Sequence, residues 1–413
     1  MDKKYVANLI AGAQYNSLDD LRYNQKIGIM FSKEELNEFL SIKEQLIEEK
    51  FKLMQKIPLK TFNSKYCFYV DGIYLQDLLL EYMRLLIADY EMKQSFLFTR
   101  NEKEMVISRL FSEIEGSLNI ESVPTTQRRI AEIHKSNNLQ DENDIIIRNM
   151  LQAVAFIIHE KPAFNKDNLR KLYDILSCSC LPEEKKLKKE AYYRHDEVFI
   201  DVFEGADYRI LDECMDSLFA FANDPDNIKK YDILLPYICH YYILYIHPYF
   251  DYNGRTARMV SFWLSFIYDI AGAPLFMSEA INEHKGDYYR ALTNTRTTNN
   301  DLTYFLGYIL ETSIKYSFVY KNLEEIKNGL LKTGDTLTTG EWGYVKKILA
   351  HNSENYFNYK MFMEYIHAKM SKQGAIKILD NLSDYDILLK SKNKKGEIIY
   401  KFNPDCITYR YNK

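Results

Sequence analysis

The feature that most constrains the fold is a helical spacing of apolar residues, which returns in segment after segment. Leu234, Ile238 and Tyr241 form one such stripe, and Met259 and Phe262 belong to another. Spacings of three and four residues place apolar side chains on one face of an α-helix, which can bury that face against a core. The sequence therefore predicts a mainly α fold. The expected helices lie near 36–56, 72–94, 143–160, 167–177, 278–294 and 301–328.

The composition indicates a folded chain with more than one packed unit. Its 413 residues are too many for one ordinary core, and 46% hydrophobic with 27% charged residues exclude a disordered tail protein. The apolar run from Met259 to Tyr268 is shorter than the ~20 residues that a bilayer requires. The first residues lack a signal-peptide pattern and the six cysteines are scattered, so we expect a cytoplasmic protein without a membrane segment or a structural metal.

Two segments depart from the helical spacing. Residues 193–208 contain a β-prone run, Val198 to Phe203, followed by Gly205, which predicts a short β-hairpin inside the helical region. Beyond Gly334, three short helical stretches precede two β-prone stretches around a basic turn, an order typical of a winged helix-turn-helix. The expected elements of this module are helices near 341–350, 358–369 and 372–382 and strands near 387–390 and 397–402.

Charge separates this C-terminal module from the rest of the chain. Residues 335–413 hold 13 basic and 9 acidic side chains, a net charge of +4, which leaves −8 on residues 1–334. A surplus of this size attracts phosphate groups only modestly. We expect the module either to contact DNA or a protein partner, or to complete the fold by packing alone.

The most informative stretch runs from His247 to Arg258. Pro248 cannot continue the preceding helix and disfavours helical geometry at His247, so we expect the imidazole to face a loop. Asn253 is a favourable N-cap residue and Gly254 a small first-turn residue, which predicts that a second helix starts there. The unpaired N–H groups of its first turn then form an anion site in the same loop.

Charged side chains add to this anion site. Arg255 and Arg258, three residues apart, supply two guanidinium groups suited to phosphate oxygens. Asp251 supplies a carboxylate that suits Mg²⁺ beside those phosphates. Each feature alone has an ordinary explanation as a cap, a solvated face or a turn, but their concentration in one short segment favours a functional site.

The segment resembles the Fic domain, whose signature runs HPFx(D/E)GNGRxxR. The matching residues are His247, Pro248, Asp251, Asn253, Gly254, Arg255 and Arg258. Tyr249 stands where the signature has Phe. The resemblance extends over residues of about 100 to 320. It includes a hairpin similar to the family's target-binding flap, with Tyr193, Val198, Phe199 and Ile200, and a later helix with Tyr288 and Tyr289.

This resemblance implies transfer of a nucleoside monophosphate, usually AMP from ATP, to a hydroxyl group of a protein. It implies that His247 deprotonates the Ser, Thr or Tyr hydroxyl and that Asp251 holds Mg²⁺. The flap would add an edge strand to the target segment. The nucleotide-binding residues that it implies are Tyr252, Asn253, Gly254, Arg255, Arg258, Tyr288 and Tyr289.

Tyr252 departs from the signature, because it stands where the family has the first Gly of Gly-Asn-Gly. Glycine there allows a positive φ or a close backbone approach, and an aromatic residue resists both. Either Tyr252 points outward and its N–H remains available, or the anion site is altered and the activity is weak. A change in nucleotide preference is a further alternative.

The segment Phe111 to Gly116 resembles the inhibitory helix of Fic proteins, (S/T)xxxE(G/N). Glu115 and Gly116 match the pattern, whereas Phe111 stands where the family has Ser or Thr. The resemblance implies that Glu115 pairs with Arg258 and blocks the γ-phosphate. The alternative is a helix that ends at Gly116 with an incidental Glu.

The predicted organisation is an N-terminal helical region (1–100), an inhibitory helix (101–120), a Fic core (121–330) and a winged helix (335–413). The leading hypothesis is an autoinhibited protein adenylyltransferase that uses ATP and Mg²⁺ and modifies an unidentified protein target, itself included. One alternative is a regulatory or DNA-binding protein with a weakened Fic core. Another is an enzyme that removes AMP, with Glu115 positioning a water molecule.

Overall fold

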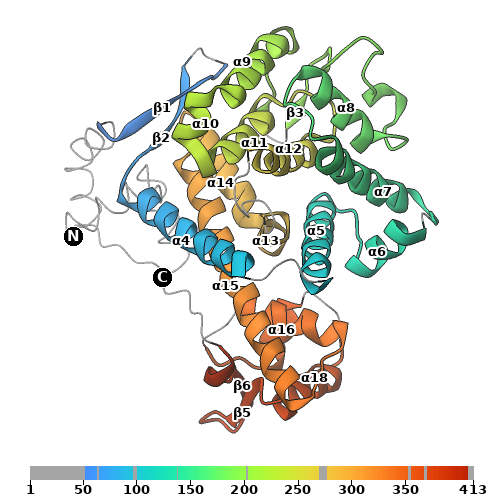
Figure 1. Cartoon of the computed structure of the whole chain (residues 1–413), viewed down its shortest axis with the longest axis vertical. Coiled ribbons are helices and arrows are strands. Elements are labelled where there is room, and N and C mark those ends of the chain that lie inside the picture. Colours follow the sequence, from blue (N-terminus) through green and yellow to red (C-terminus); the bar gives the residue numbers. More distant parts are fainter. Residues whose placement is uncertain are drawn as a thin grey trace. The chain divides into compact units, whose positions relative to one another are not determined.

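The fold is mainly helical, as the apolar spacing predicts (Figure 1). The chain divides into two units, Met1–Thr312 and Ser313–Lys413. Helix α15 (Thr303–Thr333) begins in the first unit and continues in the second. This computed structural model describes residues 52–62, 65–95, 100–136, 138–200, 203–268, 277–351, 355–366 and 370–407.

Helices and two antiparallel hairpins form the described part of the first unit. The strands are β1 (Met54–Lys60), β2 (Tyr66–Val70), β3 (Phe199–Ile200) and β4 (Phe203–Glu204). The α-helices are α4 (Ile73–Ser95), α5 (Arg100–Ile120), α6 (Gln127–Ser136), α7 (Glu142–Ala155), α8 (Lys166–Ser177), α9 (Leu211–Asn223), α10 (Pro225–Tyr231), α11 (Leu235–Ile246), α12 (Asn253–Ile267), α13 (Met277–Glu283) and α14 (Lys285–Thr297). The shorter turns are the π-helical η1 (Phe156–Glu160) and the 3₁₀ turns η2 (Glu183–Lys185), η3 (Tyr208–Ile210) and η4 (Asp232–Leu234).

Helices α11 and α12 pack against each other in this unit (Figure 1). Nearly every side chain of α11 is buried, as expected for a helix that is apolar on all sides. In α12, Trp263 is fully buried, and its indole N–H donates to the carbonyl of Pro162 at 2.9 Å. Residues 247–252 connect the two helices. The loop that the sequence singles out is therefore held between two buried helices.

A β-hairpin replaces the end of the helix predicted over 36–56. Residues 36–51 lie outside the described part of the chain, but strand β1 begins at Met54 and pairs with β2. Ile57 and Leu59 are buried while the residues beside them are exposed, which is the two-residue period of a strand. The prediction that the helix reaches residue 56 was wrong, because so short an alternation is easily read as a helix end.

This hairpin packs on α11. The hydroxyl of Tyr242 donates to the carbonyl of Lys60 at 3.0 Å, and the ring of Phe62 stacks on Tyr245 with centroids 4.2 Å apart. Both tyrosines lie in the last half of α11. The end of the hairpin therefore lies close to the segment that leads into the signature loop.

The later predicted helices of the first unit agree with the structure to within a few residues, with one exception. The segment predicted as one helix over 278–294 forms two helices, α13 and α14. They are separated at His284, whose φ of −126° and ψ of 42° are not helical.

Beyond α15, the described residues of the second unit form three α-helices followed by a hairpin, in the predicted order. Strands β5 and β6 pair in antiparallel register, and Gly396 in their turn has a φ of 79°. The elements are α16 (Thr339–His351), α17 (Tyr359–Tyr365), α18 (Lys372–Asp384), β5 (Leu388–Lys392), β6 (Ile398–Phe402) and the 3₁₀ turn η5 (Pro404–Cys406). The assignment as a winged helix stays a prediction. Over the described residues, every helix is too short or too polar to cross a bilayer.

Helix α5 passes through Gly116 and ends at Ile120, close to the predicted bounds of 101–120, so the alternative of a helix that ends at Gly116 was wrong. Gly116 permits close packing instead. A Cβ atom at this position would lie 2.6 Å from backbone atoms of Ser278 and Glu279. The missing side chain therefore lets the backbones of α5 and α13 approach each other.

Gly116→Ala should destabilise the first unit, although alanine is the better helix former. Alanine gains about 1 kcal/mol in helix propensity, but overpacking typically costs about 1–3 kcal/mol, and backbone atoms cannot move aside as a side chain can. Denaturant unfolding measures the difference. Gly329→Ala in α15 is the matched control, since nothing lies within 4 Å of its added Cβ, and it should leave stability unchanged or raise it. Equal stability of both variants would contradict the close packing.

Candidate active site

His247 follows α11 in a left-handed conformation that turns the chain out of the helix. Its φ and ψ are 54° and 66°, and its N–H donates to the carbonyl of Ile243 at 2.9 Å. Burial, followed by the guanidinium group of Arg194, lowers the pKa of His247 to about 4. The imidazole is therefore neutral near pH 7, which is the form that can accept a proton from a hydroxyl group.

The side chain of Asn253 closes the loop after His247. Its Oδ1 accepts from the N–H of Tyr249 at 3.0 Å, and its Nδ2 donates to the carbonyl of Tyr249 at 2.8 Å. Tyr249, which replaces the Phe of the signature, stacks its buried ring on Tyr173 with centroids 3.9 Å apart. Helix α12 begins at Asn253, with Tyr252 as its N-cap. The predicted N-cap role of Asn253 was wrong, because its amide closes the loop instead.

Two hydrogen bonds hold the carboxylate of Asp251. The ammonium group of Lys185 lies 2.7 Å from Oδ2, and the N–H of Tyr252 donates to Oδ1 at 2.7 Å. Burial opposes ionisation, but these contacts outweigh it and lower the pKa of Asp251. A group that already holds one cation fits as a ligand for Mg²⁺, which proteins often bind through one carboxylate and the substrate's phosphates. Within the described ranges, no cluster of three or more His, Cys, Asp and Glu side chains could hold a metal by itself.

The first turn of α12 brings together the parts of the predicted anion site. Gly254 lies beside Glu121, and a Cβ atom on Gly254 would collide with the Glu121 carboxylate. Arg255 is buried, with its guanidinium carbon 3.4 Å from the centre of the Tyr252 ring. Its Nε and Nη1 have no hydrogen-bond partner among the residues that the structure describes. A buried guanidinium group with unused donors therefore lies at the start of α12.

Tyr252 adopts the backbone conformation that glycine would favour in this position. Its φ is 68° and its ψ is 6°, and its side chain is buried against Arg255. Its N–H donates to Asp251, so it is not available to an anion, and its ring does not point outward as one alternative required. A left-handed conformation costs about 1–2 kcal/mol for a residue with a Cβ. Burial of the ring and its cation–π contact with Arg255 offset that cost.

Arg258 is buried and pairs with Ser117 of α5 and with Glu121, the residue that follows α5. Its Nε donates to the hydroxyl of Ser117 at 2.8 Å and its Nη2 to the carbonyl of Ser117 at 3.1 Å. The same Nη2 lies 2.6 Å from Oε1 of Glu121. Burial opposes ionisation of Glu121, but Arg258 outweighs it and holds the pKa of Glu121 below its usual value. The second arginine of the signature, Arg258, is therefore already paired with an ionised carboxylate.

Glu121 forms the ion pair that the sequence analysis assigned to Glu115, so that assignment was wrong. Ser117 and Glu121 are one helical turn apart and both reach Arg258. They also fit the spacing (S/T)xxxE, and Ser122 follows with a φ of 60°, where the pattern has Gly or Asn. The sequence contained this signal. It was missed because Glu115-Gly116 matches the end of the pattern, E(G/N), whereas Glu121 is followed by Ser122.

Helix α14 contributes Tyr289 to the edge of the site. Tyr289 is 46% exposed, and its pKa is raised by burial and by the neighbouring Glu121 carboxylate. Tyr288, by contrast, is buried, and its hydroxyl lies 2.8 Å from Nε2 of His240. Of the two tyrosines predicted to contact nucleotide, Tyr289 is therefore the better placed.

The predicted flap is present as a hairpin next to the end of α11. In its register, Phe199 lies opposite Glu204 and Ile200 opposite Phe203. The Nη2 of Arg296 donates to the carbonyl of Glu204 at 2.7 Å and to the carbonyl of Tyr245 at 3.2 Å. One guanidinium group thus joins strand β4 to α11.

The side chains predicted for the flap have different environments. Tyr193 is buried and Val198 is half-buried, so these two anchor the segment. Phe199 is 74% exposed. It is the most exposed of these three side chains; the side chain of Ile200, also predicted for the flap, lies outside the described residues.

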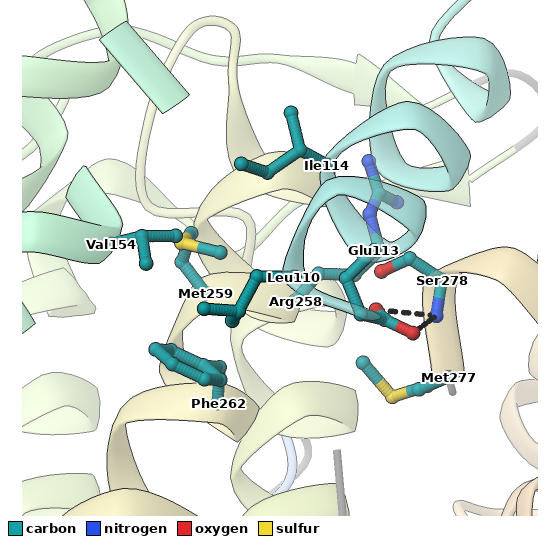
Figure 2. Close-up of a pocket in the computed structure, with 9 residues that line it drawn as sticks. All are labelled: Leu110, Glu113, Ile114, Val154, Arg258, Met259, Phe262, Met277 and Ser278. Atoms are coloured by element: carbon teal, nitrogen blue, oxygen red, sulfur yellow. Dashed lines mark hydrogen bonds between the residues drawn. The ribbon is translucent and has the colours of Figure 1, made fainter. Parts of the chain in front are cut away.

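A pocket that shares Arg258 with this site lies between α5, α7, α12 and α13 (Figure 2). Its lining residues are Leu110, Glu113, Ile114, Val154, Arg258, Met259, Phe262, Met277 and Ser278. This mostly apolar lining does not suit a phosphate group. The carboxylate of Glu113 accepts from the N–H of Ser278 at 2.9 and 3.1 Å, and burial raises the pKa of Glu113 to about 8. The pocket is therefore part of the packing that holds α5 in place.

Comparison with known proteins agrees with the geometry of the loop. Residues 163–265 match the model of the Fic/DOC family, and this range includes the flap and the signature loop. Over residues 163–265 the sequence therefore matches a Fic/DOC domain, as the resemblance predicted.

Solved structures include similar folds. The crystal structure of a Fic family protein from Desulfovibrio desulfuricans G20 is 15% identical, with a TM-score of 0.50 over 84% of this chain and 99% of that chain. Residues 134–508 of Fic-1 from C. elegans are 16% identical, with a TM-score of 0.43 over 59% of this chain and 69% of that chain. The similarity to the Desulfovibrio desulfuricans protein covers 84% of this chain, so the shared fold extends well beyond residues 163–265.

Glu113→Gln should change how stability depends on pH. The pKa of Glu113 is about 8 in the folded protein against 4.5 for an ordinary Glu, so the folded state binds more protons than the unfolded state between these values. The stability that this proton contributes is complete below the lower value and is lost as the pH rises through the higher one. The variant does not ionise, and its melting temperature should therefore fall less between about pH 6 and pH 9 than that of the unmutated protein.

The matched control is Glu213→Gln, which changes an exposed carboxylate on α9. It should retain the pH dependence of the unmutated protein. A Glu113→Gln variant with the same pH dependence as this control would contradict the burial of a protonated Glu113.

Proposed function

We propose that this protein is an autoinhibited adenylyltransferase, which transfers AMP from ATP to a hydroxyl group of a protein target and releases pyrophosphate. The observation that carries the proposal is the ion pair between Glu121 and Arg258 at the start of α12, beside a loop that holds a neutral His247. Phosphoryl-type transfer depends mainly on alignment and on charge stabilisation. The loop supplies a base and cationic donors for both purposes.

Each residue of the loop has a distinct task in this proposal. His247 accepts the proton of the target hydroxyl, and the first turn of α12 at Gly254 faces the phosphates. Arg255 and Arg258 bind phosphate oxygens. Asp251 would hold Mg²⁺, which neutralises phosphate charge when it is bound. Asn253 keeps the loop in shape through its two hydrogen bonds to Tyr249.

Glu121 opposes productive binding in two ways. Its carboxylate occupies donors of Arg258 that a phosphate requires, and its negative charge repels a phosphate at the same position. ATP could then bind only with its terminal phosphates displaced. Removal of Glu121 from Arg258 would be the activating step.

The flap presents the target to the base. Its strands are short, and a target segment in extended conformation could pair with an edge of this hairpin. Exposed Phe199 would cover one side of that segment. Main-chain pairing fixes a hydroxyl in space with little demand on the target's sequence, which is compatible with self-modification.

The second unit has a separate proposed task in binding DNA or a protein. Lys394 and Lys395 are exposed in the turn between β5 and β6. They concentrate positive charge at the tip of the hairpin, where a phosphate backbone or an acidic surface could be contacted.

Glu121→Gly should raise transfer from labelled ATP, seen first as label on the protein itself. Misalignment of about 1 Å can cost ~10²-fold in rate, so a gain of that order is expected when the carboxylate is removed. Addition of Arg258→Ala should abolish the gain, because the freed guanidinium group is what the phosphate requires. Glu115→Gly removes a carboxylate of α5, the helix that Glu121 follows; it is the matched control and should not activate. If Glu121→Gly is folded, binds ATP and stays as inactive as the unmutated protein, the inhibitory role is refuted.

His247→Ala, made in the Glu121→Gly background, should bind ATP as before and lose transfer. Positioned proton transfer typically contributes ~10²–10⁴-fold, which is the loss expected in the rate of labelling. Calorimetric titration with ATP supplies the binding control. Retained labelling would show that His247 is not the base.

A further inference from the structure

Arg194 is a buried arginine whose side chain bonds to backbone carbonyls on two separate segments. It is 2% exposed. Its Nε donates to the carbonyl of His247 at 2.8 Å and its Nη1 to that of Asp196 at 2.6 Å. Its Nη2 donates to the carbonyl of Ala206 and, at 3.5 Å, to that of Ile246. One guanidinium group thus joins both ends of the flap to the end of α11.

The end of α11 is a favourable place for this positive charge. The last carbonyl groups of a helix have no partner within the helix and carry its partial negative charge. Ile246 and His247 contribute two such carbonyls to Arg194. The planar guanidinium group can serve several carbonyls at once, which the single ammonium centre of a lysine cannot do with the same geometry.

The backbone on both sides approaches Arg194 closely. The N–H of Arg194 donates to the carbonyl of Pro248 at 2.9 Å, and the N–H of Ala206 donates to the carbonyl of Ile246 at 3.0 Å. Gly205 makes this approach possible, because a Cβ atom there would lie 2.9 Å from Nη2 of Arg194 and 3.4 Å from Cβ of His247. The flap is therefore fastened directly beside the proposed base.

We propose that Arg194 is a positioning residue that fixes the flap in register with His247, so that a target hydroxyl paired to the flap is delivered to the base. The proposal rests on the proposed function for the roles of the flap and of His247. We call the hydrogen bonds from Arg194 to the flap and to the end of α11 the clamp. The clamp can be tested without any transfer reaction.

Arg194 also acts on the charge state of the base. It lies close enough to favour neutral His247, together with Arg296, while Asp251 acts in the opposite direction. The same guanidinium group therefore positions the imidazole and helps to keep it unprotonated. This second effect supplies a readout that a purely structural residue would not move.

Arg194→Lys tests the clamp, because it keeps the charge and removes the planar set of donors. Amide hydrogen exchange at Gly205 and Ala206 should accelerate roughly tenfold or more, since hydrogen bonds from a charged donor are lost. Exchange in the β5–β6 hairpin should not change. Arg209→Lys is the matched control, an exposed arginine that pairs with Asp207 beside the flap.

Two further variants test the proposal if Arg194→Lys does not fold. Gly205→Ala, which crowds Nη2 of Arg194, should reproduce the faster exchange in the flap. Arg194→Gln should raise the pKa of His247, followed by NMR of labelled histidine, because a neighbouring positive charge is removed. Arg194→Lys should raise it less.

The outcomes separate the clamp from the enzyme. Flap exchange equal to that of the unmutated protein in both Arg194→Lys and Gly205→Ala would overturn the proposal, and so would equal acceleration in α11 and α12. If the flap loosens selectively but Glu121→Gly shows no transfer, the clamp stands and the proposed function fails. If both hold, Arg194→Lys in the Glu121→Gly background should lower the rate of self-labelling at saturating ATP without changing the KM for ATP.

Discussion

The site depends on how the buried charge of Arg258 is satisfied. A guanidinium group removed from water must be paired and hydrogen-bonded, or the fold loses several kcal/mol. Ser117 of α5 and Glu121, which directly follows this helix, meet this demand with a hydroxyl, a carbonyl and a carboxylate. Helix α5 is therefore held against the signature loop by the same contact that would exclude a phosphate. Any anion that competes for Arg258 must also replace this part of the packing.

The loop between α11 and α12 has a strained backbone at its first and last residues. His247 and Tyr252 both have positive φ, in a region that side chains with a Cβ rarely adopt. The surrounding contacts hold them there: Arg194 bonds to the carbonyl of His247, and Arg255 covers the ring of Tyr252. The consequence is a loop whose shape is set before any ligand arrives, which is what alignment chemistry requires.

Local sequence patterns predicted the helices and the signature loop, which depend mainly on residues close together in the sequence. Helix periodicity gave most helices, and the spacing of His247, Asp251 and Arg258 identified the loop. Two features were not predicted from the sequence, because they depend on contacts between distant segments. The N-terminal hairpin shows its alternation only at Ile57 and Leu59, and the choice of Glu121 over Glu115 depends on which face of α5 meets α12. Gly116 looked like a helix end in sequence, whereas in the fold it makes room for α13.

The two signature arginines differ in whether their donors are hydrogen-bonded, and this difference affects how the site binds an anion. Arg258 has its donors engaged by α5, whereas Nε and Nη1 of Arg255 are buried and find no hydrogen-bond partner in the described residues. Unsatisfied buried donors cost about 1–3 kcal/mol each. An anion bound at Arg255 would recover part of that cost, but the same anion gains nothing at Arg258 until Glu121 leaves. We therefore expect the first contact of a phosphate with this site to form at Arg255, with the contact to Arg258 as the step that α5 controls.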